Sequence, residues 1–144
     1  MRKLFFPITI LLFIASSFTV FQTQEKDILG KWVIDIHSVD AMTKATIIAT
    51  RKINPEQADK MEANIEEVNT ITAKTNYVFS EDNTFTVQSN GEPQPGTWAF
   101  SDDKKFLLLT RNGKTRKDSI IELSPKRLQL FHGDRKVATL FVRP

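Results

Sequence analysis

The stretch that decides the fold is ILGKWVIDI, residues 28–36, and a second stretch, PGTWAF at residues 95–100, resembles it. The chain has two tryptophans, and each stands two residues after a glycine at the head of an apolar alternation. A period of two is typical of a β-strand with one buried face. We therefore predict a strand over residues 29–37 whose inner face carries Trp32, Ile34 and Ile36.

Composition limits the remaining possibilities. A chain of 144 residues is long enough for one domain with its own hydrophobic core. It contains no cysteine, which excludes disulfides, cysteine-ligated metals and a lipid-modified N-terminal cysteine. Burial and hydrogen bonding must therefore stabilise the fold.

The first residues have the pattern of an export signal. Arg2 and Lys3 precede an apolar run over residues 4–15, and small residues follow at the spacing that a signal peptidase accepts. We predict a signal peptide over residues 1–23, with the cleavage point open, and a domain over residues 24–144. An uncleaved leader would be a membrane anchor and the chain's one membrane contact. The predicted location is periplasmic or secreted.

Without the leader the domain is close to neutral. Two of the 20 Lys and Arg residues lie in the leader, which leaves 18 against 17 Asp and Glu. No basic patch interleaved with aromatic residues emerges from the sequence, so nucleic acid is not an expected partner.

A helical insertion is predicted at residues 39–72. Asn54 and Pro55 have the pattern of a helix start, in which asparagine caps the helix and proline takes its first position. Apolar residues then recur at spacings of three and four, which predicts one amphipathic helix of about four turns: Ala58, Met61, Ile65 and Val68. The preceding segment, residues 41–52, fits either another helix or a strand.

From residue 74 onward short apolar runs alternate with turn residues. The runs predict strands at residues 77–79, 85–87, 98–100, 106–110, 118–123, 128–132 and 136–142. Hairpin turns between them imply antiparallel neighbours. Together with the strand at Trp32 they predict an all-β fold, an eight-stranded up-and-down antiparallel barrel with a helical insertion between strands 1 and 2.

These residues resemble a known family. Gly30 and Trp32 resemble the Gly-x-Trp signature of the lipocalins, and residues 77–85, 96–98 and 102–109 are similar to bacterial lipocalin-like domains of exported proteins, which are calycin-type barrels. The resemblance implies that Trp32 closes one end of the barrel beneath a basic side chain from the last strand. Arg143 is the first candidate for that side chain and Arg135 the second.

The two glycines of the repeated motif have a structural interpretation. Gly30 and Gly96 lack side chains where strands of a barrel cross closely. The helical insertion departs from the secreted lipocalins and is similar to the fatty-acid-binding proteins, in which helices cap the barrel mouth.

The sequence offers little for catalysis or for metals. Its histidines, His37 and His132, stand at predicted strand ends beside polar residues, and we interpret both as solvated side chains. No nucleophile motif and no calcium-loop spacing is present. We therefore expect no catalytic residues, no metal site and no cofactor.

The predicted inner face of the barrel is the candidate binding site. Its apolar residues either fill the barrel or line a cavity for one small hydrophobic molecule, since eight strands permit both: Ile34, Ile36, Tyr77, Phe79, Phe85, Val87, Trp98, Phe100 and Leu130. The favoured prediction is a non-enzymatic exported barrel that binds such a ligand. The alternatives are an envelope structural or protein-interaction module with a filled core and an unspecified protein partner, and, third, a calycin-type enzyme.

Overall fold

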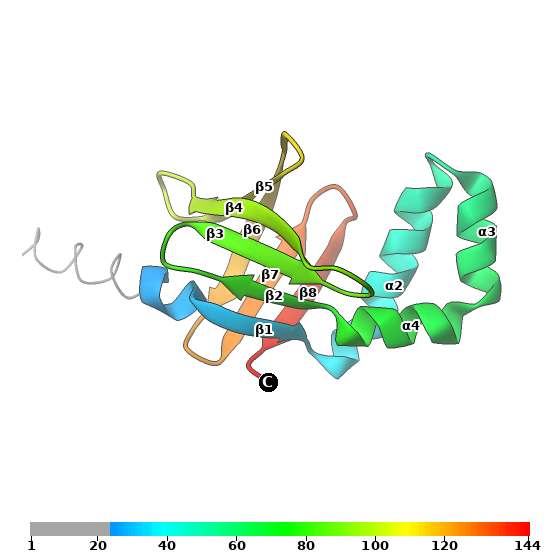
Figure 1. The fold of residues 1–144 in the computed structure, drawn as a ribbon, viewed down its shortest axis with the longest axis horizontal. Helices are drawn as coiled ribbons and strands as arrows, with labels where there is room; N and C mark the ends of the chain where they lie inside the picture. Colours follow the sequence, from blue (N-terminus) through cyan, green and yellow to red (C-terminus); the bar gives the residue numbers. More distant parts are fainter. Residues whose placement is uncertain (1–23) are drawn as a thin grey trace, which may run out of the picture.

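The computed structural model describes residues 24–144, and the predicted signal peptide lies outside them. The described chain is a closed antiparallel barrel with a group of helices at one end (Figure 1). Its eight strands are β1 (Gly30–Ile34), β2 (Asn76–Phe79), β3 (Thr84–Gln88), β4 (Gln94–Phe100), β5 (Phe106–Arg111), β6 (Lys114–Leu123), β7 (Arg127–His132) and β8 (Val137–Val142). The predicted fold class is confirmed.

Each strand pairs with the next along the chain, and β8 returns to pair with β1 through Val33 with Val142 and Ile34 with Phe141. The hairpins use the turn residues expected from the sequence. Asn112 and Gly113, between β5 and β6, both have positive φ, at 51° and 71°, as a tight two-residue hairpin requires. Local turn chemistry thus sets an up-and-down order that closure completes.

The first strand is shorter than predicted. It ends at Ile34, and Asp35 caps the helix α2 (Ile36–Arg51) by accepting a hydrogen bond from the His37 backbone N–H at 3.0 Å. Ile36 is therefore the first residue of a helix and is 69% exposed, so its assignment to the barrel lining is wrong. Alternation alone does not detect this boundary, because a capping aspartate also fits the polar side of a strand.

The insertion contains three helices, at residues 36–74. Residues 41–52 are helical within α2, which resolves the open alternative, and α3 (Pro55–Ala63) begins as predicted, with Asn54 accepting from the Gln57 N–H at 3.1 Å. The predicted single helix is wrong, because the chain breaks at Asn64 before α4 (Ile65–Lys74). Asn64 has φ of −120° and ψ of 39°, outside the helical range.

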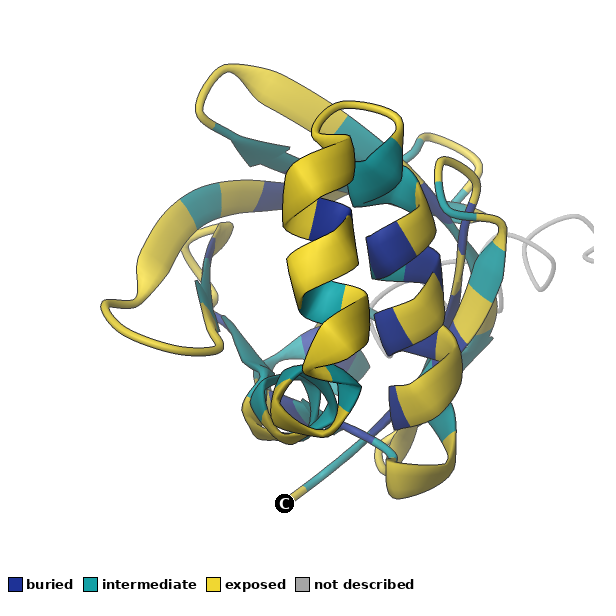
Figure 2. Ribbon diagram, turned by 90° about the vertical axis from the view of Figure 1, so that its right-hand side faces the viewer, coloured by how far each residue is buried: buried dark blue, intermediate teal, exposed yellow. Residues whose placement is uncertain are grey.

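The helices lie over the mouth of the barrel (Figures 1 and 2). α2 packs beside β8 and α4 beside β1, and a hydrogen bond of 2.9 Å joins Thr43 of α2 to Thr72 of α4. Arg51 binds Asp59 and Glu62 and so ties α2 to α3. The insertion therefore covers one end of the barrel.

Among residues 24–144, no helix has both the length and the apolar content needed to span a bilayer.

Candidate ligand cavity at the barrel mouth

A cavity of about 1100 Å³ lies between the barrel mouth and the helices. Apolar residues of four strands and three helices contribute to its lining, among them Leu109 of β5, Met42 of α2, Met61 of α3 and Ile71 of α4. The narrow stripe on the predicted helix is thus divided, since Met61 and Val68 line the cavity and Ala58 is fully buried. The helices and the barrel thus line one partly open cavity.

The predicted lining residues divide between this cavity and the packed core. Ile34, Tyr77, Phe85 and Val87 line the cavity. Phe79, Trp98 and Leu130 are almost fully buried in the core, and Phe100 packs against it.

Aromatic contacts explain why one half of the barrel is filled. The Phe79 ring meets the Trp98 ring edge to face at 6.0 Å, and Phe100 meets Trp98 at 5.7 Å. The Trp98 indole N–H donates to the Ser80 carbonyl at 3.0 Å. The barrel is therefore filled toward its closed end and hollow toward its mouth. An eight-stranded barrel can be filled or can hold a cavity, and this one does each at a different end.

The closed end has the arrangement that the resemblance implied. The Arg143 guanidinium lies 3.7 Å from the centroid of the Trp32 ring, and Trp32 is fully buried. Arg143 also donates to the backbone carbonyls of Asp27, Lys31 and Pro125. Burial lowers the pKa of Arg143, but an arginine remains protonated. Arg135, the second candidate, lies at the mouth instead.

A side chain at either glycine of the motif would come close to a neighbour, the Arg143 side chain at Gly30 and the Phe85 ring and Thr110 backbone at Gly96. Gly30 has φ of +96°, and a Cβ there would lie 3.0 Å from the Arg143 Nη1. At Gly96 a Cβ would lie 2.5 Å from both the Phe85 ring and the Thr110 carbonyl oxygen. These are structural positions, as expected.

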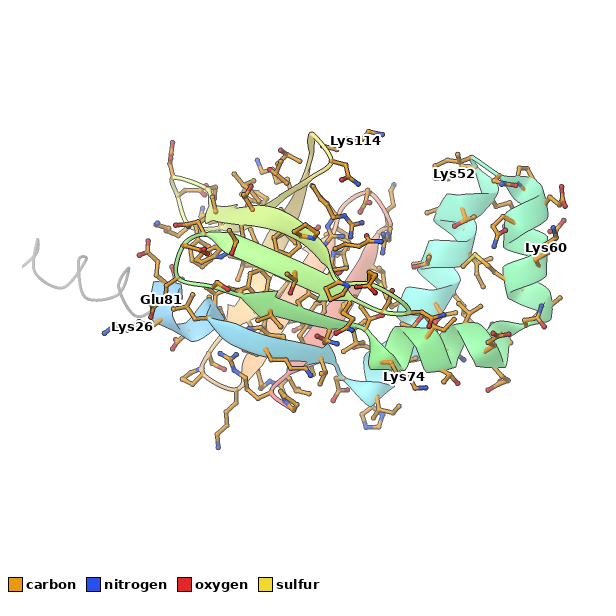
Figure 3. The ribbon with its side chains drawn as sticks, in the orientation of Figure 1. Lys26, Lys52, Lys60, Lys74, Glu81 and Lys114 are labelled. Carbon is orange, nitrogen blue, oxygen red and sulfur yellow. The ribbon has the colours of Figure 1, made fainter. Side chains whose placement is uncertain are left out.

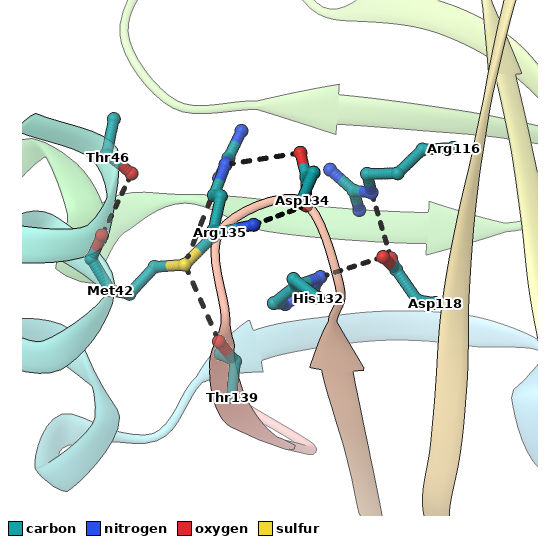
Figure 4. Close-up of polar contacts among 8 residues, drawn as sticks. All are labelled: Met42, Thr46, Arg116, Asp118, His132, Asp134, Arg135 and Thr139. Atoms are coloured by element: carbon teal, nitrogen blue, oxygen red, sulfur yellow. Dashed lines mark hydrogen bonds and ion pairs between the residues drawn. The ribbon is translucent and has the colours of Figure 1, made fainter. Parts of the chain in front are cut away.

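The structure contains a buried polar cluster that was not predicted from the sequence (Figure 4). The Arg116 Nε donates to Asp118 at 2.9 Å, and the His132 Nδ1 lies 3.1 Å from the other Asp118 oxygen. Asp118 and His132 are both fully buried. The interpretation of His132 as a solvated side chain is wrong, because the two-residue period of Leu128 and Leu130 continues inward to it. That period was the available signal.

The cluster is incompletely hydrogen-bonded. The short His132 to Asp118 separation is not aligned for a hydrogen bond, so both His132 ring nitrogens lack a partner within the described chain. The Arg116 Nη2 is likewise buried without a hydrogen-bond partner among residues 24–144. Burial lowers the pKa of Arg116, but interactions with Tyr77 and Asp118 together raise this pKa by more, so the net shift is upward. Arg116 is therefore a permanent cation at the cavity wall.

Further basic residues gather at the mouth, although the sequence showed no basic patch. Arg111 and Lys114 border the β5–β6 hairpin, and Arg135 lies on the β7–β8 turn. Arg111, Lys114 and Arg116 all belong to the β5–β6 hairpin and lie close together in the sequence, and Arg135 joins them from a separate turn. With Arg116 they form what we call the polar wall of the cavity: Arg111, Lys114, Arg116 and Arg135.

The remaining candidates stay apart from the cavity. His37 is exposed in the first turn of α2. The structure groups no three histidine, aspartate or glutamate side chains in a metal-binding arrangement within residues 24–144.

Fold and cavity together define a class, the small lipocalin-like barrel with a helical cover over one end. The model of one family, described as "Lipocalin-like domain (DUF4923)", matches residues 14–142. The chain belongs to this family.

Two solved structures are similar to this chain. A DUF4847 family protein from Bacteroides vulgatus ATCC 8482 is similar at a TM-score of 0.50 and 12% identity, covering 81% of this chain and 94% of its own. A protein from Bacteroides uniformis ATCC 8492, solved by NMR, has a TM-score of 0.42 and 26% identity over 48% of this chain and 72% of its own. No curated protein matched the chain.

Proposed function

We propose that the protein is a non-enzymatic, exported barrel that binds one small hydrophobic or amphipathic molecule in the cavity beneath its helices. The observation that carries this proposal is the cavity itself, whose volume of about 1100 Å³ is as large as typical ligand pockets. Export is inferred from the charged and apolar leader at residues 1–23.

The distribution of polar groups supports binding over catalysis. Ile34, Phe85 and Val87 give the cavity an apolar floor. Its lining includes the carboxylates Glu67 and Asp134, of which Asp134 lies beside Arg135, but the buried His132 does not line it. An acid–base residue has to reach the reacting atoms of its substrate. A binding protein needs only an enclosed apolar surface with a few polar groups that orient the ligand.

The first experiment is native mass spectrometry of the protein purified from its own envelope, followed by calorimetric titration with fatty acids, retinoids and haem. Val87→Trp should abolish binding because the indole would occupy the cavity. Thr86→Trp is the matched control, since the neighbouring side chain on a strand points to the opposite face. Equal binding by both variants, or a bare protein that binds none of the panel, would refute the proposal.

A second candidate function is a protein-interaction module. It is favoured by large apolar residues on the outer surface, notably Ile48 and Ile53 near the α2–α3 turn, which are 60% and 89% exposed. This function predicts that Ile53→Lys removes a partner from pull-downs while ligand titrations stay unchanged.

A further inference from the structure

The cavity has two chemically different sides. Phe85, Val87 and Leu109 supply an apolar floor, and Val68 and Ile71 of α4 add apolar cover. The polar wall supplies four cations to the same space, and the other charged residues of the lining are two lysines, Lys60 and Lys117, and two carboxylates, Glu67 and Asp134. A ligand that contacted both sides would need an apolar body and a polar end.

The positive charge of the wall exceeds what the protein neutralises. Asp134 lies beside Arg135 at 3.9 Å, and Asp118 is bound to Arg116. Arg111 and Lys114 form no ion pair within the described chain. Figure 3 shows Lys114 at the tip of the β5–β6 hairpin. This excess favours an anion, because like charges grouped around one space are stabilised by a counter-charge.

Arg116 provides the most specific observation. Its Nε donates to Asp118 and Tyr77 also interacts with the guanidinium, while its Nη2 is buried without a hydrogen-bond partner among residues 24–144. A buried donor on a charged group normally has a partner. The Arg116 side chain lines the cavity and is 26% exposed, so a bound ligand can reach the guanidinium there.

Arg135 also has a weak hydrogen-bond acceptor. Its Nη1 lies 3.9 Å from the Met42 sulfur, and a thioether is a weak acceptor (Figure 4). Arginine binds planar anions through two parallel N–H bonds, and a carboxylate matches that geometry.

We propose that the polar wall is an anion subsite and that the cavity takes an amphipathic carboxylate, with the carboxylate at Arg116 and the apolar body on the floor. This inference rests on the proposed binding function and adds the chemical class of the ligand.

The test compares probes of one chain length, dodecanoate, dodecan-1-ol and dodecyltrimethylammonium, by calorimetry with the folded protein. Dodecanoate should bind about tenfold or more tightly than the alcohol, since charge-assisted hydrogen bonds are the stronger ones. The cationic probe should bind most weakly. Equal affinity for acid and alcohol would overturn the carboxylate subsite while leaving the binding function standing. If none of the probes binds, the proposed function fails as well.

Variants then locate the subsite. Arg116→Gln should weaken dodecanoate binding about tenfold and leave dodecan-1-ol within about twofold. Because this change leaves Asp118 buried without Arg116, the paired variant Arg111→Gln with Lys114→Gln provides a second measurement at the two ends of the β5–β6 turn. It should selectively weaken the acid too. Lys26→Gln, at the opposite end of the barrel in Figure 3, is the charge-matched control and should change neither affinity. Loss of acid binding equal in this control and in the wall variants would overturn the assignment.

Discussion

At the scale of single residues, the closed end of the barrel depends on Trp32. The indole is fully buried, donates to the Ile28 carbonyl at 2.7 Å and lies beneath Arg143. One side chain thus combines apolar burial, a buried hydrogen bond and a cation–π contact. Packing, a hydrogen bond and a cation–π contact therefore account for the Gly-x-Trp motif.

Replacing Arg143 tests that arrangement. Arg143→Met should lower the free energy of unfolding by about 1–3 kcal/mol, because the cation–π contact and the hydrogen bonds to three carbonyls are lost. Urea denaturation followed by tryptophan fluorescence measures the change. Arg127→Met, which removes an exposed pair with Glu122, should cost less than about 1 kcal/mol. Similar losses in both variants would contradict the role of Arg143.

Gly96 gives a second test with a matched control. A Cβ at this position would overlap the Phe85 ring and the Thr110 carbonyl, so Gly96→Ala should destabilise the protein by about 1–3 kcal/mol. At Gly133 a Cβ would meet no atom within 4 Å, and Gly133→Ala should be close to neutral. Thermal unfolding of both variants compares them directly. A stable Gly96→Ala protein would contradict the close approach of β3 and β5 around β4.

At the scale of elements, the insertion is built from short helices that depend on their caps. α3 is nine residues long and mostly exposed, with only Ala58 buried. A helix of this length has little stability of its own. We therefore expect the cap at Asn54 and Pro55 to contribute much of the stability of α3.

Removing the cap should loosen the cover and spare the barrel. Asn54→Ala is expected to cost about 1 kcal/mol, because the Gln57 N–H loses its acceptor. Hydrogen exchange should rise in α3 while the strands stay protected. Asn90→Ala, in the exposed β3–β4 connection, serves as the control and should leave exchange in α3 unchanged. Uniform loss of protection across the strands would show that α3 does not open independently.

At the scale of the whole molecule, closure by β8 joins the two ends of the described chain. β8 pairs with β1, supplies the buried Phe141 and is followed by Arg143 at the closed end. Loss of this strand would expose both edges of the sheet at once. The stability of the fold therefore depends on closure of the barrel by β8.

Truncation tests closure. Removing residues 140–144 should abolish cooperative unfolding, since the loss of Phe141 alone costs about 3–5 kcal/mol out of a total of about 5–15 kcal/mol. Removing only the exposed Pro144 should have no measurable effect. Near-ultraviolet circular dichroism through a urea titration distinguishes the two. A cooperative transition in the longer truncation would contradict the requirement for β8.

The sequence by itself determined the barrel, because its signals are local. The two-residue period at Trp32, turn pairs such as Asn112 with Gly113, and the cap at Asn54 each depend on neighbours in the chain. The break at Asn64 escaped prediction because the apolar spacing continues across it. The end of β1 escaped prediction because Ile36 keeps the alternation.

Only the tertiary structure decided where the barrel is filled and where it is hollow. That division depends on which strand ends meet at the mouth, and it separates Trp98 in the core from Val87 in the cavity. The structure also brought Arg116, Asp118 and His132 together and placed the helices over them. Arg116 and Asp118 share one face of β6 through the two-residue period, but their meeting with His132 depends on the register between β6 and β7, which a one-residue shift would reverse.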